Sequence, residues 1–129
     1  MEIKHMALLA LATLTLASCA VTVVNVNDIS DVYVTDFISD DIERCRPSDV
    51  DLNHSEAREF FVRAKRVDAR TLHNHYNYAP CHIEGILKYR SESCDWEIRA
   101  GATGQIRCGN ENWYFVCDEC DDLFETKAM

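Results

Sequence analysis

The clearest pattern in the chain is a pair of stretches in which apolar and polar residues alternate strictly. Residues 94–99 read Cys-Asp-Trp-Glu-Ile-Arg, and residues 104–108 read Gly-Gln-Ile-Arg-Cys. Alternation with a period of two is typical of a β-strand that buries one face. Between the two stretches, Ala100-Gly101-Ala102 is short enough for a hairpin loop. We therefore expect an antiparallel hairpin.

This hairpin also predicts a disulfide. Folding it about Gly101 places Trp96 opposite Ile106 and Cys94 opposite Cys108, so that apolar residues meet on one face. Directly opposed residues in an antiparallel pair lie close enough for their sulfurs to bond. We expect a disulfide between Cys94 and Cys108.

An amphipathic helix is predicted after residue 53. Asn53 can cap its start, and Glu56 stands three residues later, which is the spacing of a capping box. The apolar residues that follow recur at helical spacing and form one stripe: Ala57, Phe60, Phe61, Ala64 and Val67. We expect this stripe to pack in the core.

Together these elements predict an α+β fold. Strands are expected at about 82–89, 94–99, 103–108 and 113–117. Residues 28–50 are acidic and irregular, with a short strand at 32–34 at most, and residues 71–80 read as a polar, aromatic loop. The sequence therefore predicts one amphipathic helix packed on a four-stranded antiparallel meander, stabilised by disulfides, in a single domain over residues 29–129.

The start of the chain has the pattern of an export signal. Lys4 is followed by an apolar run of about a dozen residues, which is shorter than the ~20 residues that a membrane span needs. The run ends in Leu16-Ala17-Ser18-Cys19, which resembles the lipobox of bacterial lipoproteins. The resemblance implies a signal peptide at 1–18, a lipid on Cys19 and a tether at 19–28. Because Ala20 rather than Asp follows the cysteine, it also implies sorting to the periplasmic face of the outer membrane.

Six further cysteines follow the lipobox: Cys45, Cys81, Cys94, Cys108, Cys117 and Cys120. An even number of cysteines in an exported domain indicates disulfides. Cys117 and Cys120 form a CxxC motif, which in a reducing compartment would suggest redox chemistry or zinc binding. Asp118 and Glu119 inside the motif, and Asp121 and Asp122 after it, raise thiol pKa values and oppose that chemistry. Structural bridges that involve Cys45 and Cys81 are the favoured interpretation.

The chain is acidic, with a formal net charge of −9 from 13 basic and 22 acidic residues. A nucleic-acid-binding protein needs a basic face, because contacts to phosphates supply much of its affinity. Nucleic acid is therefore not an expected partner. The acidity suits solubility, or association with a basic protein partner.

Three consecutive aromatic residues, Trp113, Tyr114 and Phe115, must divide between the two faces of the sheet. If the helix covers one face, Tyr114 is either an exposed residue beside Tyr89 or Tyr76, or it lies under a second layer formed by residues 28–50. Exposed aromatic side chains beside acidic residues suit a protein interface.

Histidines offer the main candidate for metal chemistry. His73 and His75 stand two residues apart, and His82 adjoins Cys81. Neutral imidazoles can ligate zinc or copper, and the alternative is a loop whose side chains cover the sheet edge. We expect no metal or other cofactor. We also expect no enzymatic activity, because the chain offers neither a nucleophile–base pair nor a pattern of paired carboxylates.

Three stretches after the signal, residues 80–85, 94–104 and 114–120, look like parts of small uncharacterised envelope proteins of bacteria. That resemblance implies no activity. Periplasmic immunity proteins are similar in format, since they are small, exported, disulfide-bonded and often acidic. The expected function is that of a non-enzymatic, protein-binding or inhibitory lipoprotein of immunity type. The alternatives are a structural, envelope-maintenance lipoprotein and a thiol- or metal-binding periplasmic protein.

Overall fold

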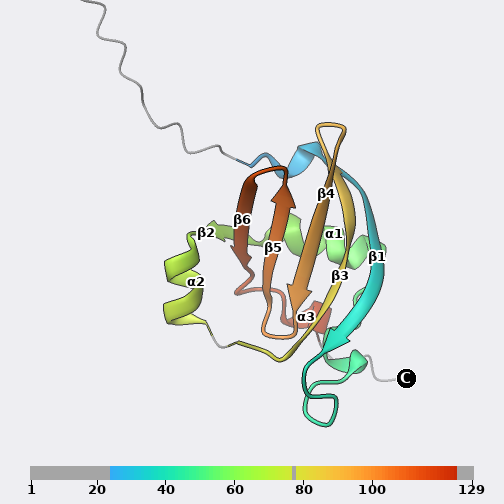
Figure 1. Ribbon diagram of the computed structural model, residues 1–129, viewed down its shortest axis with the longest axis vertical. Coiled ribbons are helices and arrows are strands. Elements are labelled where there is room, and N and C mark those ends of the chain that lie inside the picture. Colours follow the sequence, from blue (N-terminus) through green and yellow to red (C-terminus); the bar gives the residue numbers. More distant parts are fainter. Residues whose placement is uncertain (1–23, 77, 125–129) are drawn as a thin grey trace, which may run out of the picture.

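The computed structural model describes residues 24–76 and 78–124, which form a six-stranded antiparallel sheet with short helices around it (Figure 1). The strands lie in the order β1-β3-β4-β5-β6-β2. Their bounds are β1 Ile29–Ser39, β2 Lys65–Val67, β3 Cys81–Tyr89, β4 Glu92–Arg99, β5 Thr103–Cys108 and β6 Glu111–Val116. The helices are α1 His54–Arg63, α2 Ala69–His75 and α3 Asp121–Phe124, with the 3₁₀ turns η1 Val26–Asp28 and η2 Pro47–Val50.

The predicted fold, one helix on a four-stranded meander, is wrong. The four expected strands are present as β3–β6, but β1 and β2 extend the sheet on its two sides. Strand β1 escapes the sequence pattern because its pairing with β3 is irregular at two points, between Ser30 and Tyr33 and between Val34 and Asp36. At each irregularity, the residues that face the core fall out of step with a strict alternation of apolar and polar positions. A continuous strand therefore reads as an irregular acidic segment.

The helical prediction is right at its start and wrong at its end. The capping box is present, since Asn53 Oδ1 accepts the Glu56 N–H at 2.8 Å. The helix ends at Arg63, and the backbone turns to extended geometry at Ala64 before β2 pairs with β6.

The expected loop at 71–80 is also partly wrong, because residues 69–75 form α2. Its cap is Asp68, whose Oδ1 accepts the Thr71 N–H at 2.6 Å. The apolar stripe of α1 appeared to continue past Arg63 to Val67, directly before this cap, and it hid the new helix start.

Helix α1 packs its apolar stripe on one face of the sheet, here called the covered face. Ala57, Phe60 and Phe61 are fully buried, and the Phe61 ring makes edge contacts with Trp96 at 5.9 Å and Phe115 at 5.3 Å between centroids. In Figure 1 the helix lies behind β3, β4 and β5. The core of the molecule therefore lies between α1 and this face.

The three disulfides confirm the pairing predicted from the hairpin and give the pairings that the sequence left open. Cys94 is bonded to Cys108, with Cα atoms 4.7 Å apart. The remaining bonds are Cys45–Cys81 and Cys117–Cys120, so the CxxC cysteines do not bridge to Cys45 or Cys81. The reason is local: the chain reverses after β6 and returns Cys120 to Cys117, whereas the loop after β1 carries Cys45 to the first residue of β3.

The outer edge of β1 is partly covered by the start of α1. The Val34 N–H donates to His54 Nδ1 at 2.8 Å, and the His54 ring meets the Tyr33 ring edge-on at 5.4 Å. Within β3, a Cβ atom added at Gly85 would collide with the Tyr33 carbonyl. Glycine at this position lets β1 approach β3 closely at the irregular pairing.

Residues 24–28 of the predicted tether belong to the packed domain. Val24 and Val26 pack against the core, and the Asn25 N–H donates to Tyr89 Oη at 3.1 Å. The predicted signal peptide and Cys19 lie outside the described residues. Among the residues that are described, no helix is both long and apolar enough to cross a membrane.

Candidate protein-binding surface

The face of the sheet opposite α1, here called the open face, carries no helix over its centre (Figure 1). In β3, side chains alternate between buried residues on the covered face and His82, Glu84, Ile86 and Lys88 on the open face. Antiparallel sheets commonly present one such face to solvent. Its side chains are therefore available to a partner.

Exposed apolar side chains lie along the β1–β3 side of the open face. Tyr33 and Ile86 are directly opposed in the register and are 49% and 44% exposed. Ile38 is opposed to His82 and is 38% exposed, and Tyr78, just before β3, is 68% exposed. We call these four residues, Tyr33, Ile38, Tyr78 and Ile86, the open-face stripe. Amphipathic aromatic and aliphatic side chains of this kind are typical anchors of protein interfaces.

A row of three carboxylates crosses the stripe. Asp36 of β1 is opposed to Glu84 of β3, which is opposed in turn to Glu97 of β4. Like charges placed directly opposite each other destabilise a sheet. His82 lies beside the row, with Nε2 3.6 Å from Glu84 Oε1 and Nδ1 3.8 Å from Glu97 Oε2. A cation bound at this row would relieve the repulsion.

Arg99 neutralises one end of the carboxylate row. Its Nη2 lies 3.3 Å from Glu97 Oε2, and its Nη1 donates to the Ala79 carbonyl at 3.0 Å. The guanidinium carbon lies 4.3 Å from the centroid of the Tyr78 ring, which is cation–π geometry. Arg99 thus fixes Tyr78 in place, and it leaves Asp36 and Glu84 as the carboxylates of the row that have no Arg or Lys partner in the described chain.

A cleft of about 370 Å³ adjoins the stripe where α2 meets the sheet. Leu72, His73 and Tyr76 form the helix side, and Thr103, only 6% exposed, lies on the sheet side. The cleft is large enough to receive one side chain of a partner.

Asp118 holds α2 in this position. Tyr76 Oη donates to Asp118 Oδ1 at 3.3 Å, and Lys65 Nζ lies 3.0 Å from Asp118 Oδ2. The hydrogen bond to this carboxylate raises the pKa of Lys65 above its ordinary value, and the charge of Asp118 adds to the effect. The helix wall of the cleft is therefore tied to the end of β6.

The histidines that were metal candidates are not gathered into one site. His73 and His75 belong to α2, and His82 points from β3 toward Glu84 and Glu97. In the described chain, no group of three or more His, Cys, Asp or Glu side chains could hold a metal ion. Cys81 and both CxxC cysteines are oxidised, so they offer no thiolate.

Sequence reasoning missed most of the open-face stripe. The opposition of Asp36 to Glu84 depends on the two irregularities in β1, and no sequence signal gives their positions. The aromatic run is resolved: Trp113 and Phe115 are buried, and Tyr114 is half-buried on the open face. Tyr89 does not join Tyr114, because it is buried on the covered face. Residues 29–39 form the side of the sheet and not a second layer over it.

Comparisons of the chain with protein-family models, with curated proteins and with solved structures find no match. The open face is therefore the feature of the described chain whose chemistry points to a function.

Proposed function

We propose that this protein is a non-enzymatic lipoprotein of the cell envelope that binds a basic protein partner, in the manner of an inhibitor or immunity protein. Its anchor is a lipid on Cys19 at the periplasmic face of the outer membrane. The observation that supports the binding role is the open face, where exposed apolar side chains surround two carboxylates, Asp36 and Glu84, that oppose each other.

The chemistry of this surface favours a cationic partner. A Lys or Arg side chain placed between Asp36 and Glu84 would remove their mutual repulsion, and an Arg could bind a carboxylate through two hydrogen bonds. Apolar contacts with Tyr33 and Ile86 would exclude water from the ion pair and strengthen it. The net charge of −9 would speed the approach of a basic protein.

A paired-variant capture experiment tests the binding role. The full chain, its D36N/E84Q variant and its E43Q/D51N variant are used to recover proteins from an envelope extract. The control changes the net charge equally but alters loop residues, Glu43 and Asp51, that make no ion pair or side-chain hydrogen bond in the described part of the chain. We expect a basic protein whose recovery falls by about tenfold with D36N/E84Q only, and whose binding weakens as salt rises. Equal recovery by all three proteins, or equal loss from both variants, would overturn the proposal.

The anchor is tested separately with Cys19→Ala. Intact mass and membrane fractionation are measured for the natural chain and for the variant. We expect the variant to lack the acyl mass and to leave the membrane fraction. Unchanged mass and partitioning would contradict lipidation and would leave the open-face proposal standing.

A further inference from the structure

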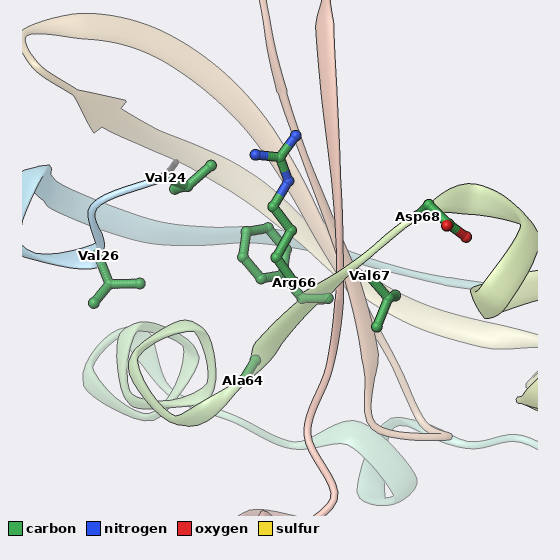
Figure 2. Close-up of a pocket in the computed structure, with 7 residues that line it drawn as sticks. Val24, Val26, Ala64, Arg66, Val67 and Asp68 are labelled. Atoms are coloured by element: carbon green, nitrogen blue, oxygen red, sulfur yellow. The ribbon is translucent and has the colours of Figure 1, made fainter. Parts of the chain in front are cut away.

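An apolar trough of about 430 Å³ opens where the described chain begins. Its lining residues are Val24, Val26, Ala64, Arg66, Val67, Asp68 and Phe115. Figure 2 shows Val24 and Val26 on one side, across from Ala64 and Arg66 of the segment that enters β2. Phe115, which is paired with Arg66 across β6 and β2, is only 2% exposed and closes the trough on the core side.

The position of the trough in the chain limits its distance from the proposed anchor. Five residue steps separate Val24 from Cys19. At no more than ~3.6 Å for each residue, the Cα atom of Val24 can lie at most about 18 Å from that of Cys19. That distance is smaller than the domain itself, because the eleven residues of β1 alone span roughly 30 Å. The anchor therefore holds the trough end of the domain next to the bilayer.

We infer that the trough is a lipid-facing surface, which docks on the interfacial region of the membrane. The inference rests on the proposed acylation of Cys19. Val24, Val26 and Ala64 are half-buried apolar residues around the trough, and the exposed Arg66 and Asp68 add one cation and one carboxylate to its rim. Apolar side chains of this kind enter the boundary between headgroups and acyl chains, and the long apolar stem of an Arg lets its charge stay among the headgroups.

The same geometry orients the rest of the molecule. In Figure 1 the beginning of the described chain lies at the top, and the loop after β1 lies at the bottom. That loop carries Asp40, Asp41 and Glu43, and Tyr78 Oη donates to Asp40 Oδ2 at 3.5 Å. Docking through the trough therefore turns this loop, with Tyr78 beside it, away from the bilayer and toward a soluble partner.

Tryptophan fluorescence tests the orientation. The acylated full chain is reconstituted in vesicles of phosphatidylethanolamine and phosphatidylglycerol, with or without bromine on the acyl chains of the lipids. Val24→Trp places a probe in the trough, and Ile42→Trp is the matched control at the far end, where Ile42 is 58% exposed. The natural Trp96 and Trp113 are buried and supply the background signal.

We expect brominated lipid to quench the Val24→Trp signal about twofold and to leave Ile42→Trp unchanged. Val26→Trp is a second trough probe in case Val24→Trp does not fold. A trough filled by the protein's own acyl chains would not be quenched, because those chains carry no bromine, and that result overturns the inference. Quenching of Ile42→Trp to the same extent also overturns it.

Intact mass of the same sample separates the two failures. If Cys19 carries acyl mass and the trough probes are not quenched, the docking inference is wrong and the anchor stands. If Cys19 carries no acyl mass, both the anchor and the inference that rests on it are wrong.

Discussion

At the scale of single residues, Gly104 shows how tightly α1 is fitted to the sheet. A Cβ atom at this position would lie 2.7 Å from Phe60 Cε1 and 3.2 Å from Phe61 Cε1. Both rings are fully buried, and Phe61 also contacts Trp96 and Phe115. If either ring were displaced, the core side chains packed against it would therefore have to move as well.

Gly104→Ala should destabilise the protein by about 1–3 kcal/mol, because one added methyl group overpacks this contact. Chemical denaturation followed by near-UV circular dichroism measures the change. Gly101→Ala is the control, since Gly101 is exposed in the turn between β4 and β5 and has no positive φ angle. Equal stability of the Gly104 variant and the natural protein would mean that α1 shifts away from β5 freely.

At the scale of elements, the disulfides close loops of very different length. Cys45–Cys81 spans 36 residues, Cys94–Cys108 spans 14 and Cys117–Cys120 spans 3. A cross-link stabilises mainly by restricting the unfolded chain, and the effect grows with loop length, to about 3 kcal/mol for a loop of ~15 residues. The three bonds should therefore contribute unequally, although all six cysteines are buried.

Replacing each cysteine pair with alanines should reveal this order. We expect the largest loss of unfolding free energy without Cys45–Cys81, a loss of about 3 kcal/mol without Cys94–Cys108 and the smallest loss without Cys117–Cys120. Guanidinium denaturation of the three double variants gives the comparison. A loss from the CxxC pair as large as the others would show that the loop-length argument does not apply here.

The contact between α1 and α3 depends on pH through Asp122. Arg63 Nη1 lies 2.7 Å from Asp122 Oδ1, and the hydrogen bond from this guanidinium lowers the pKa of Asp122 below its ordinary value. A lowered carboxyl pKa stabilises the folded state above the unfolded pKa, near 3.9 for aspartate, and the effect is lost as pH falls through the folded value.

The stability difference between the natural protein and Asp122→Asn should therefore be present at neutral pH and shrink as pH falls below about 4. Thermal unfolding at a series of pH values measures it. The neighbouring Asp121→Asn, whose side chain has no ion-pair partner among the described residues, should show no such trend. A difference that is constant with pH would contradict the role of the Arg63 pair.

The elements also differ in how far the sequence determines them. The β4–β5 hairpin was predicted with its register, because strict alternation, a short loop and two cysteines agree: Trp96 is opposed to Ile106, as expected. Only residues 32–34 of strand β1 were expected as a strand, because its bulges interrupt the alternation, and the pairing of Asp36 with Glu84 follows only from those bulges. The short β2 was hidden as well, because Val67 continues the helical stripe by coincidence of spacing. The candidate surface combines residues from both irregular and regular strands, so only part of it could be read from the chain.

At the scale of the whole molecule, charge opposes folding. The net charge of −9 is unchanged by removal of the first 18 residues, since that segment holds one Glu and one Lys. Repulsion among carboxylates destabilises a compact state, and salt screens it.

The unfolding temperature should therefore rise between about 10 mM and about 150 mM NaCl, as the Debye length falls from ~30 Å to ~8 Å. Calorimetry of the soluble Cys19→Ala variant measures the rise. E43Q/D51N in the same background should show a smaller rise because it carries less charge. A fall in unfolding temperature with salt would mean that favourable ion pairs outweigh the repulsion.

The outer edge of β1 bears on how many copies can coexist on one membrane. Strands at the sides of a sheet can pair with those of a neighbouring molecule and build ribbons. Here the bulges distort the β1 side of the sheet, and the Val34 N–H on that side donates to His54. On the opposite side, strand β2 is only three residues long. Copies concentrated in two dimensions by the proposed anchor would collide often, and these features would let them separate again as individual molecules.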